Sequence, residues 1–376
     1  MKKIVVAPDS FKGTMISLEV CDIIHRAIVS IDCGIEVVTV PISDGGEGMV
    51  EAFLCAAGGR KIYASVKDPL MRDVQAYYGI LTDGCTAVIE MAQASGIGYV
   101  ENDKRPLEAT TFGTGQLIEN ALDMGCTRII LGLGGSATTD GGTGAAAALG
   151  VRFLSEDRSE VPPGGGGLSL LHTIDASGID PRLKKTEIIL ACDVDNCLTG
   201  KAGAAAIFSP QKGASPEQVA ILDWNLAHYA SVIKDQLGQD ITEIRGGGAA
   251  GGLGVSLIAF ANARIMPGIQ VVLDTVKFDD IIADADLIIT GEGRIDSQTA
   301  LGKVPVGIAR ATRNRGIPVI AIGGSLGKGY EAVYGEGITS VFSVVNDLVP
   351  FETVKQTCRQ DLFMLIQNLF RIIIQN

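Results

Sequence analysis

The sequence has little positive charge and no long apolar run. Its 31 Lys and Arg residues face 43 Asp and Glu residues, which gives a formal net charge of −12 without any Lys/Arg-rich block. Nucleic acids and anionic membrane surfaces are therefore poor candidate partners. No window reaches about 18 uninterrupted apolar residues, so no segment is predicted to span a membrane. No cationic and apolar leader precedes the first apolar run, and we expect a cytoplasmic protein.

Cysteine pairs with metal-binding or redox spacing are also absent. The eight cysteines contain no CxxC and lie mostly inside apolar runs. Free thiols in a reducing compartment account for this pattern. The three histidines stand far apart, without the spacing of metal ligands.

Motifs of several enzyme classes are missing. No GxxxxGK[ST] sequence occurs, so the chain is not a P-loop protein. The DFG and HRD motifs of protein kinases are absent too. A phosphate ligand is still compatible with the acidic total, because backbone N–H groups bind phosphate without net positive charge.

Glycine, by contrast, is abundant. The 376 residues include 48 glycines, well above the usual share of about 7%. They show no three-residue period and no proline excess, which excludes collagen-like and low-complexity chains. They gather in short clusters, as expected of loops where the backbone approaches a ligand or another backbone. With 47% hydrophobic residues, the length suggests about two domains.

The two ends of the chain share one pattern of alternating strands and helices. Short apolar runs suited to buried parallel strands lie at 3–8, 35–42, 286–290, 317–322 and 338–344. Apolar residues at helical spacing lie at 16–31, 49–57, 305–313 and 351–374.

The middle of the chain mixes sheet types. Residues 62–81 and 87–91 predict antiparallel strands, whereas 113–124 and 128–133 predict a helix followed by a strand. A capping box at 215–218 predicts the start of another helix. We therefore predict an α/β protein in which one parallel-sheet domain, residues 1–62 plus 283–376, is interrupted by a large inserted mixed α/β domain, residues 63–282.

Polar residues follow the strands of the outer domain. In open α/β sheets ligands bind at the carboxyl ends of the strands. If these strands are parallel, one edge of the sheet gathers Asp9, Ser10, Lys12, Asp44, Glu47, Glu292, Arg294 and Asp296. For any single aspartate, capping of the next helix is the alternative. We expect the group as a whole to form a ligand site.

The strongest local signal is the glycine-rich stretch 132–144. Its glycines and hydroxyls precede an Ala-rich helix and would present N–H and O–H donors at a helix N-terminus, which suits phosphate. The predicted phosphate-binding residues are Gly134, Gly135, Ser136, Thr138, Thr139 and Asp140. The stretch also fits GxGxxA, so an NAD-type site is one alternative, although further glycines would break a Rossmann helix. A purely structural crossing of helix and strand is the other.

Asp193 follows the apolar run 188–191, which places it at the carboxyl end of a strand. A carboxylate there serves as a general base or as a Mg²⁺ ligand beside phosphate oxygens. The alternative is that it caps a turn. Asp195 alternates with it and points to the opposite face unless the strand bends.

Taken in order, these motifs resemble the type-1 glycerate kinase family. The matching stretches cover nearly the whole chain, at 7–12, 40–48, 89–96, 132–144, 191–194, 210–214, 248–254 and 289–298. Each stretch is short, but their combination is specific. After about residue 350 only the helical character matches.

The resemblance implies ATP-dependent phosphorylation of D-glycerate, at the 2-hydroxyl to give 2-phosphoglycerate or, as an alternative, at the 3-hydroxyl. It also implies two α/β domains, one flavodoxin-like and one inserted, with the active site in the cleft between them. This agrees with the interrupted order predicted above. ATP with Mg²⁺ and glycerate would be the small-molecule partners of a monomer or homodimer.

Phosphoryl transfer needs positioning, charge neutralisation and a base near the acceptor hydroxyl. We assign Asp193 as the base or Mg²⁺ ligand, and Lys12 and Arg294 as cations for the transferring phosphate and the glycerate carboxylate. Predicted substrate contacts are Asp9, Ser10, Asp44, Glu292 and Asp296. A non-catalytic sensor on the same fold would be expected to lose these groups. An NAD-dependent hydroxy-acid dehydrogenase is the weaker enzymatic alternative.

Overall fold

The computed structural model of the chain describes residues 1–374 except 44, 47 and 348. It divides into two compact units. Unit 1 comprises Met1–Asp44, Glu51–Gly58 and Ile269–Asn376, and unit 2 comprises Gly45–Val50 and Gly59–Gly268. The chain thus enters unit 2 briefly at Gly45–Val50, returns to unit 1, and then builds most of unit 2 between Gly59 and Gly268.

Unit 1 is built on a parallel sheet. Its strands are β1 (Lys3–Pro8), β2 (Glu36–Thr39), β11 (Leu287–Ile295), β12 (Val319–Leu326) and β13 (Ser340–Ser343). They pair in the order β13-β12-β11-β1-β2, all parallel. Residues 4–7 of β1 are completely buried, as in a sheet covered on both faces. The strand order reverses between β1 and β11, so the first strand and a late strand of the chain are neighbours.

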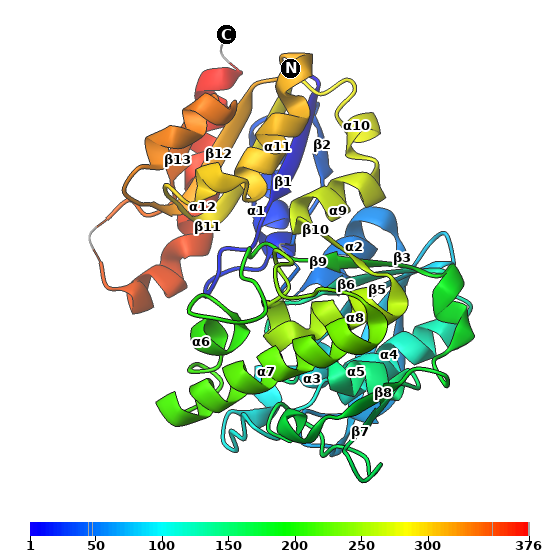
Figure 1. Cartoon of the computed structure of the whole chain (residues 1–376). Coiled ribbons are helices and arrows are strands. Elements are labelled where there is room, and N and C mark those ends of the chain that lie inside the picture. The colour runs from blue at the N-terminus through cyan, green and yellow to red at the C-terminus, as the bar shows by residue number, and fades with distance from the viewer. Residues whose placement is uncertain (44, 47, 348, 375–376) are drawn as a thin grey trace. The chain divides into compact units, whose positions relative to one another are not determined.

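Helices flank this sheet, as Figure 1 shows. The helices of the first and last parts of the chain are α1 (Ser17–Ile31), α2 (Met49–Ala57), α9 (Gly268–Val276), α10 (Phe278–Ile281), α11 (Val304–Thr312) and α12 (Phe351–Ile373). Helix α12 buries Cys358, Leu362, Ile366 and Phe370, a four-residue spacing that forms one apolar stripe. This stripe joins the core cluster that also contains Ile24 and Ile28 of α1.

Unit 2 contains a mixed sheet. Its strands are β3 (Gly59–Lys67), β4 (Asp73–Leu81), β5 (Thr86–Glu90), β6 (Arg128–Gly132), β9 (Glu187–Ala191) and β10 (Arg264–Met266). In the order β10-β9-β6-β5-β4-β3, the first four strands pair in parallel, β4 pairs antiparallel with β5, and β3 pairs antiparallel with β4. A separate hairpin pairs β7 (Arg152–Leu154) with β8 (Thr173–Asp175). The predicted antiparallel strands in the middle of the chain are confirmed.

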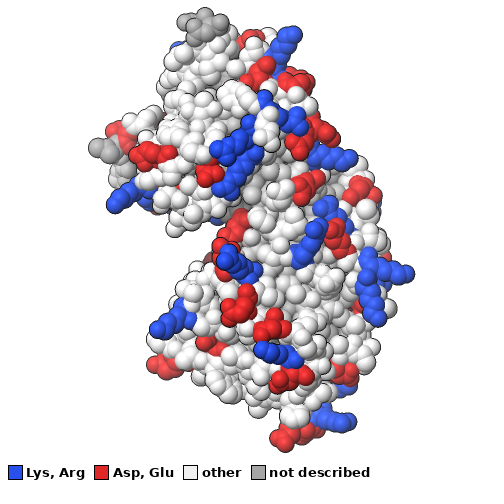
Figure 2. Space-filling view, turned by 45° about the horizontal axis from the view of Figure 1, so that its top comes forward, with Lys and Arg blue, Asp and Glu red and all other residues white. Residues whose placement is uncertain are grey.

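The helices of unit 2 include α3 (Ala92–Ser95), α4 (Phe112–Asp123), α5 (Thr143–Ala148), α6 (Ala204–Phe208), α7 (Pro216–Leu237) and α8 (Leu253–Ala261). The predicted capping box opens α7: the Gln218 backbone N–H donates to the Ser215 hydroxyl at 3.3 Å, and the Ser215 N–H donates to Gln218 Oε1 at 3.0 Å. None of the described helices is long and apolar enough to cross a membrane. On the face drawn in Figure 2, acidic and basic side chains are intermixed.

Three boundaries differ from those predicted. The strand predicted at 286–290 extends further, because β11 runs from Leu287 to Ile295. Glycine allows this, because a Cβ on Gly291 would lie 2.3 Å from the carbonyl oxygen of Ile322 on β12. The stretch 269–282 was predicted in the inserted domain and belongs to unit 1, and residues 45–50 were predicted in the outer domain and belong to unit 2. The Gly134 N–H donates to the Gly45 carbonyl at 3.1 Å, which ties residues 45–50 to the end of β6.

Candidate active site

The predicted substrate residues of unit 1 lie at the carboxyl ends of β1 and β11. Pro8 pairs with Gly291, and the Asp9 N–H donates to the Gly291 carbonyl at 2.8 Å. Residues 9–12 follow β1 directly, and Glu292 lies near the end of β11. Since the strand order reverses between these two strands, this edge is the expected ligand position of an open α/β sheet.

Glu292 is a buried carboxylate held between a hydroxyl and a cation. It is 6% exposed. The Thr299 hydroxyl donates to Oε1, and Lys303 Nζ lies 3.9 Å from Oε2. Burial raises the pKa of Glu292 above its ordinary value of 4.5, although the Thr299 hydroxyl and the charges of Lys303 and Lys12 oppose the rise. A carboxylate with a raised pKa at a ligand-binding edge suits proton transfer.

Arg294 lies two residues further along β11, on the same side of the strand as Glu292. Its Nε lies 3.5 Å from Asp296 Oδ2, and its side chain is 66% exposed. The Asp296 N–H donates to the Thr299 hydroxyl at 3.0 Å, so that the same threonine orients both acidic residues. Asp296 therefore orients the Arg294 guanidinium, which stays exposed. Its two parallel N–H groups can bind a planar anionic group such as a carboxylate.

Lys12 lies at the tip of a tight turn that packs on β11. The N–H of Phe11 donates to the Met15 carbonyl at 2.8 Å, and the Met15 N–H donates back at 3.0 Å. Gly13 adopts φ +82° in this turn. A Cβ on Gly293 would lie 3.1 Å from the Lys12 backbone nitrogen, so glycine at this position of β11 lets the turn approach. Lys12 is exposed and acts electrostatically on Glu292.

The other predicted contacts of unit 1 differ in accessibility. Asp9 is 5% exposed, and its Oδ1 accepts the Ser10 N–H at 2.6 Å. Its carboxylate therefore shapes the start of the turn, and Ser10 is the more accessible of the two. Asp44 and Glu47 lie outside the described residues. The structure thus brings together the charged side chains of Lys12, Glu292, Arg294 and Asp296.

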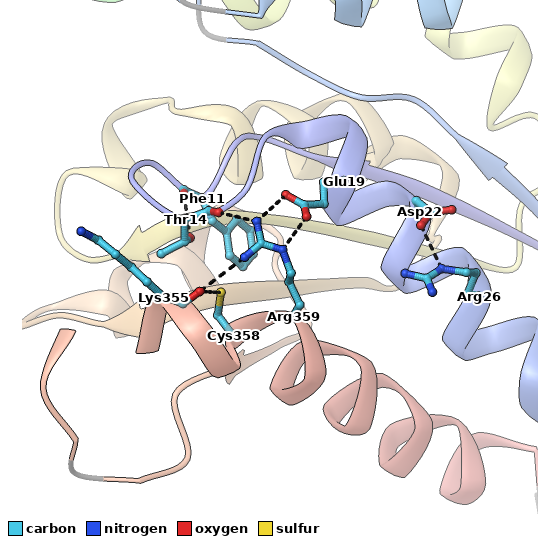
Figure 3. A network of polar contacts seen from close by, with 8 residues as sticks. All are labelled: Phe11, Thr14, Glu19, Asp22, Arg26, Lys355, Cys358 and Arg359. Atoms are coloured by element: carbon cyan, nitrogen blue, oxygen red, sulfur yellow. Dashed lines mark hydrogen bonds and ion pairs between the residues drawn. The ribbon is translucent and has the colours of Figure 1, made fainter. Parts of the chain in front are cut away.

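Arg359 on α12 holds the turn that carries Lys12. Its Nε and Nη2 donate to the two carboxylate oxygens of Glu19 on α1, at 2.6 and 3.2 Å. Nη2 also donates to the Thr14 carbonyl at 3.2 Å. Figure 3 shows the guanidinium between the Glu19 carboxylate and the turn with Phe11 and Thr14. One side chain from the end of the sequence therefore fixes a turn from its beginning.

We expect Arg359→Gln to lower kcat/KM about tenfold, because displacement of a positioned group reduces the rate. The unfolding temperature should change little, since the pair is partly exposed and such pairs contribute little stability. Arg359→Lys should not restore the rate, because an ammonium lacks the planar fork. Steady-state kinetics and thermal unfolding measure both effects.

Arg26→Gln is the matched control. It removes an exposed ion pair, 2.8 Å to Asp22, from the same helix α1 without touching the turn (Figure 3). Equal kinetic losses in the two variants would contradict the positioning role of Arg359.

The glycine-rich stretch of unit 2 is organised around Asp140. This side chain is completely buried. Its carboxylate accepts five hydrogen bonds, from the Thr110 hydroxyl, from the N–H and hydroxyl of Thr111, and from the N–H groups of Gly142 and Gly144. Asp140 therefore holds the stretch together from inside, and its contact with phosphate stays a prediction.

The N–H groups at the N-terminus of α5, the helix that follows the predicted phosphate loop, are bonded within the protein. The Gly144 N–H donates to Asp140, and the Ala145 N–H donates to the Thr111 hydroxyl at 2.9 Å. The first helical donors thus already have protein acceptors. Thr138 and Thr139 are completely buried, and their hydroxyls contact the Ala250 carbonyl at 3.4 Å and the Ser209 hydroxyl at 3.0 Å. Their direct contact with a ligand likewise stays a prediction.

The accessible part of the stretch is 134–136. Gly135 is exposed, and Gly134 and Ser136 are partly exposed. Gly135 has φ +74°, and a Cβ there would lie 3.1 Å from the Ala92 Cβ. Its carbonyl accepts the Ile97 N–H at 2.9 Å, which anchors this segment to the structure beside it. We call residues 134–136 the loop rim.

Asp193 is exposed at the carboxyl end of β9. Its Oδ1 accepts the N–H of Gly268, the first residue of α9, at 2.8 Å. Asp193 therefore makes a capping contact with α9, as in the alternative interpretation of the sequence. Among the described residues, no group of three or more His, Cys, Asp or Glu side chains is arranged to hold a metal ion.

Comparison with known proteins identifies the family. The model of the "Glycerate kinase family" matches residues 4–374. The chain belongs to the glycerate kinase family. It is 50% identical over 351 residues to the glycerate kinase of Bacillus subtilis (strain 168), covering 93% of this chain and 92% of the relative. The resemblance inferred from the sequence motifs is confirmed, and the protein is a kinase.

Other relatives extend this finding. The chain is 48% identical over 347 residues to the glycerate 2-kinase of Escherichia coli (strain K12), covering 92% of this chain and 91% of the relative. A crystal structure of a putative glycerate kinase 2 from Salmonella typhimurium LT2 superposes with a TM-score of 0.90 at 44% identity, covering 100% of this chain and 98% of that one. This likeness confirms the predicted α/β fold class.

The sequence does not predict a role for Lys212, which contacts the glycine-rich stretch 132–144. Lys212 is 2% exposed, and its Nζ donates to the Thr138 carbonyl at 2.5 Å. In the sequence, the stretch 210–214 stands out only through its resemblance to the family. A lysine in a short polar segment normally predicts an exposed side chain, so only the tertiary structure reveals its burial.

Proposed function

We propose that this kinase transfers the γ-phosphoryl group of ATP to the 2-hydroxyl of D-glycerate, giving 2-phosphoglycerate. The observation that carries the proposal is the match to glycerate kinases over nearly the whole chain, among them a relative named glycerate 2-kinase. Phosphorylation of the 3-hydroxyl is the second candidate. A cytoplasmic location fits the free thiols of all eight cysteines.

In unit 1 we assign the reacting groups as follows. The guanidinium of Arg294 binds the glycerate carboxylate through its planar fork. Lys12 neutralises charge on the transferring phosphoryl group. Glu292 accepts the proton of the acceptor hydroxyl. Its burial and raised pKa make it a better candidate for this base than Asp193, which is exposed and accepts a backbone N–H. Ser10 and Asp296 lie on the same edge as further substrate contacts.

In unit 2 we assign the loop rim to the phosphates of ATP. Mg²⁺ would arrive with the nucleotide, because this ion usually keeps several waters and uses one or two carboxylates besides phosphate oxygens. Asp193, exposed at the end of β9, is the carboxylate that we assign to it. The ion would neutralise the charge of the β- and γ-phosphates.

The product decides the function. ADP release should be fast with D-glycerate and near background with glucose, lactate and tartronate. Phosphorus NMR of the product should show 2-phosphoglycerate. A 3-phosphoglycerate spectrum would replace the proposal with its second candidate, and ADP release without glycerate specificity would overturn both.

Gly135→Ala should raise the KM for ATP by about tenfold with a smaller effect on kcat. A Cβ on the exposed rim would obstruct close approach of phosphate to the backbone, and its contact with Ala92 is already tight. Rates at saturating glycerate and varied ATP measure the effect.

Gly84→Ala is the control. Gly84 has a similar positive φ, +70°, and a Cβ added there would have no heavy atom within 4 Å, so it reproduces the backbone strain far from the rim. If both variants raise the KM equally, or neither does, the rim does not bind the nucleotide.

A further inference from the structure

Lys212 has a buried side-chain amino group that forms no ion pair in the part of the chain that the structure describes. Among the described residues, the Lys212 side chain makes one hydrogen bond, to the Thr138 carbonyl. An ammonium carries three N–H donors, and burying an unpaired charge is costly. Burial lowers the pKa of Lys212 from 10.5 to about 7, and the charge of Asp140 opposes the shift only in part. No other charged group acts on it in the structure described.

The Thr138 carbonyl lies where two glycine-rich segments meet. A Cβ on Gly251 would lie 2.0 Å from this oxygen, and the Gly141 N–H donates to the Gly251 carbonyl at 2.9 Å. Residues 250–252 all have positive φ, including the non-glycine Ala250 at +51°. A strained backbone of this kind persists only when its surroundings hold it. Lys212 therefore holds a junction that lies two residues from the loop rim.

We propose that Lys212 is a positioning residue for an anionic ligand: its ammonium holds the two glycine-rich segments through the Thr138 carbonyl, and the polyphosphate of a nucleotide on the loop rim favours its charged form. The inference rests on the proposed function, since it takes the loop rim as the nucleotide site. The role of Lys212 makes the site sensitive to pH, because binding of the nucleotide becomes coupled to uptake of a proton.

The direction of the pH dependence follows from linkage. Above a pKa of about 7 the free enzyme holds Lys212 largely neutral, so ATP binding must bring in a proton and weakens as the pH rises. Between about 7 and 10.5 the unfolded chain binds this proton and the folded chain does not, so folding stability gains with pH across that window. Below about 7 both states are charged and the cost of burial is fully present.

Lys212→Met tests the proposal, with Lys104→Met as the control. Lys104 is exposed and its Nζ donates to the Gln211 carbonyl at 3.3 Å, so it belongs to the same neighbourhood without being buried. Calorimetric titration with ATP at pH 7.5, in two buffers of different ionisation enthalpy, measures affinity and proton uptake together. The protons of ATP itself contribute equally to all variants and cancel in the comparison.

We expect Lys212→Met to weaken ATP binding at least about tenfold, as for loss of a charged hydrogen bond, and to take up fewer protons than the wild type. Its thermal stability should stay equal or increase at pH 7, because a buried unpaired charge has been replaced by an apolar chain. Lys104→Met should match the wild type in all three measurements. A merely structural lysine would instead lose stability and affinity together, which would overturn the proposal.

Unchanged affinity and proton uptake in Lys212→Met would also overturn it. If Gly135→Ala still weakened ATP binding in that case, the nucleotide site would stand and only the role of Lys212 would fail; if neither variant weakened it, the assignment of the loop rim would fail as well. A second measurement does not depend on the folding of a variant. Wild-type affinity for ATP should fall between pH 6.5 and 8.5, and a flat profile contradicts the proposal.

Discussion

Glu292→Gln is expected to lower kcat by about 10²–10⁴-fold, the usual effect of removing a general base. The amide keeps the size of the side chain, and its carbonyl still accepts the Thr299 hydroxyl that now donates to Oε1. The change therefore tests the loss of the carboxylate more than packing. Initial rates at saturating ATP and glycerate measure kcat, and thermal unfolding should show little change.

The pH profile gives an independent readout of the same role. A base must be deprotonated to act, so activity should fall on the acidic side as the pH drops through the pKa of Glu292. Because burial raises this pKa above 4.5, the acidic limb should lie above that of an exposed glutamate. In Glu292→Gln the residual activity should lose this limb.

Asp193→Asn discriminates between the two candidate bases. If Glu292 is the base, Asp193→Asn should leave the acidic limb in place and reduce kcat less than Glu292→Gln does. A near-normal kcat in Glu292→Gln together with a large loss in Asp193→Asn would move the base to unit 2. Losses of activity and stability in equal measure in Asp193→Asn would favour its capping of α9.

Asp140→Ala should reduce the free energy of unfolding by about 3–5 kcal/mol, the range for removing one partner from a buried polar network. Three backbone N–H groups, those of Thr111, Gly142 and Gly144, would lose their acceptor inside the protein. Asp140→Asn should be almost as damaging, because an amide NH₂ would face N–H donors. Chemical denaturation measures the loss.

Asp83→Ala provides the comparison. Asp83 also accepts several hydrogen bonds, from the N–H groups of Cys85 and Thr86 and from the Thr86 hydroxyl, but in an exposed turn. Water replaces a lost acceptor there, so its effect should be much smaller. Equal losses at the two positions would show that burial of Asp140 does not matter. A fully stable Asp140→Ala with impaired ATP binding would support the direct phosphate contact predicted from the sequence.

Local patterns in the sequence determined much of the architecture. The apolar run 3–8 is β1 with the predicted limits, and the capping box at Ser215 and Gln218 opens α7. These features depend on residues within one or two turns of each other, so periodicity and capping preferences reveal them. The ordered motifs were sufficient for the family, and the alternation of parallel and mixed sheet patterns was sufficient for the fold class.

The tertiary structure alone decided which polar residues are buried and which are accessible. Asp140 belonged to a predicted phosphate loop, yet its partners Thr110 and Thr111 lie on another segment. Arg359 reaches the turn of Lys12 from the opposite end of the sequence, and Lys212 meets Thr138 across 74 residues. The role of a polar side chain depends on its desolvation and on acceptors brought by distant segments. Neither the desolvation of a side chain nor its distant acceptors follow a local sequence pattern. Both are determined only when the distant segments pack together.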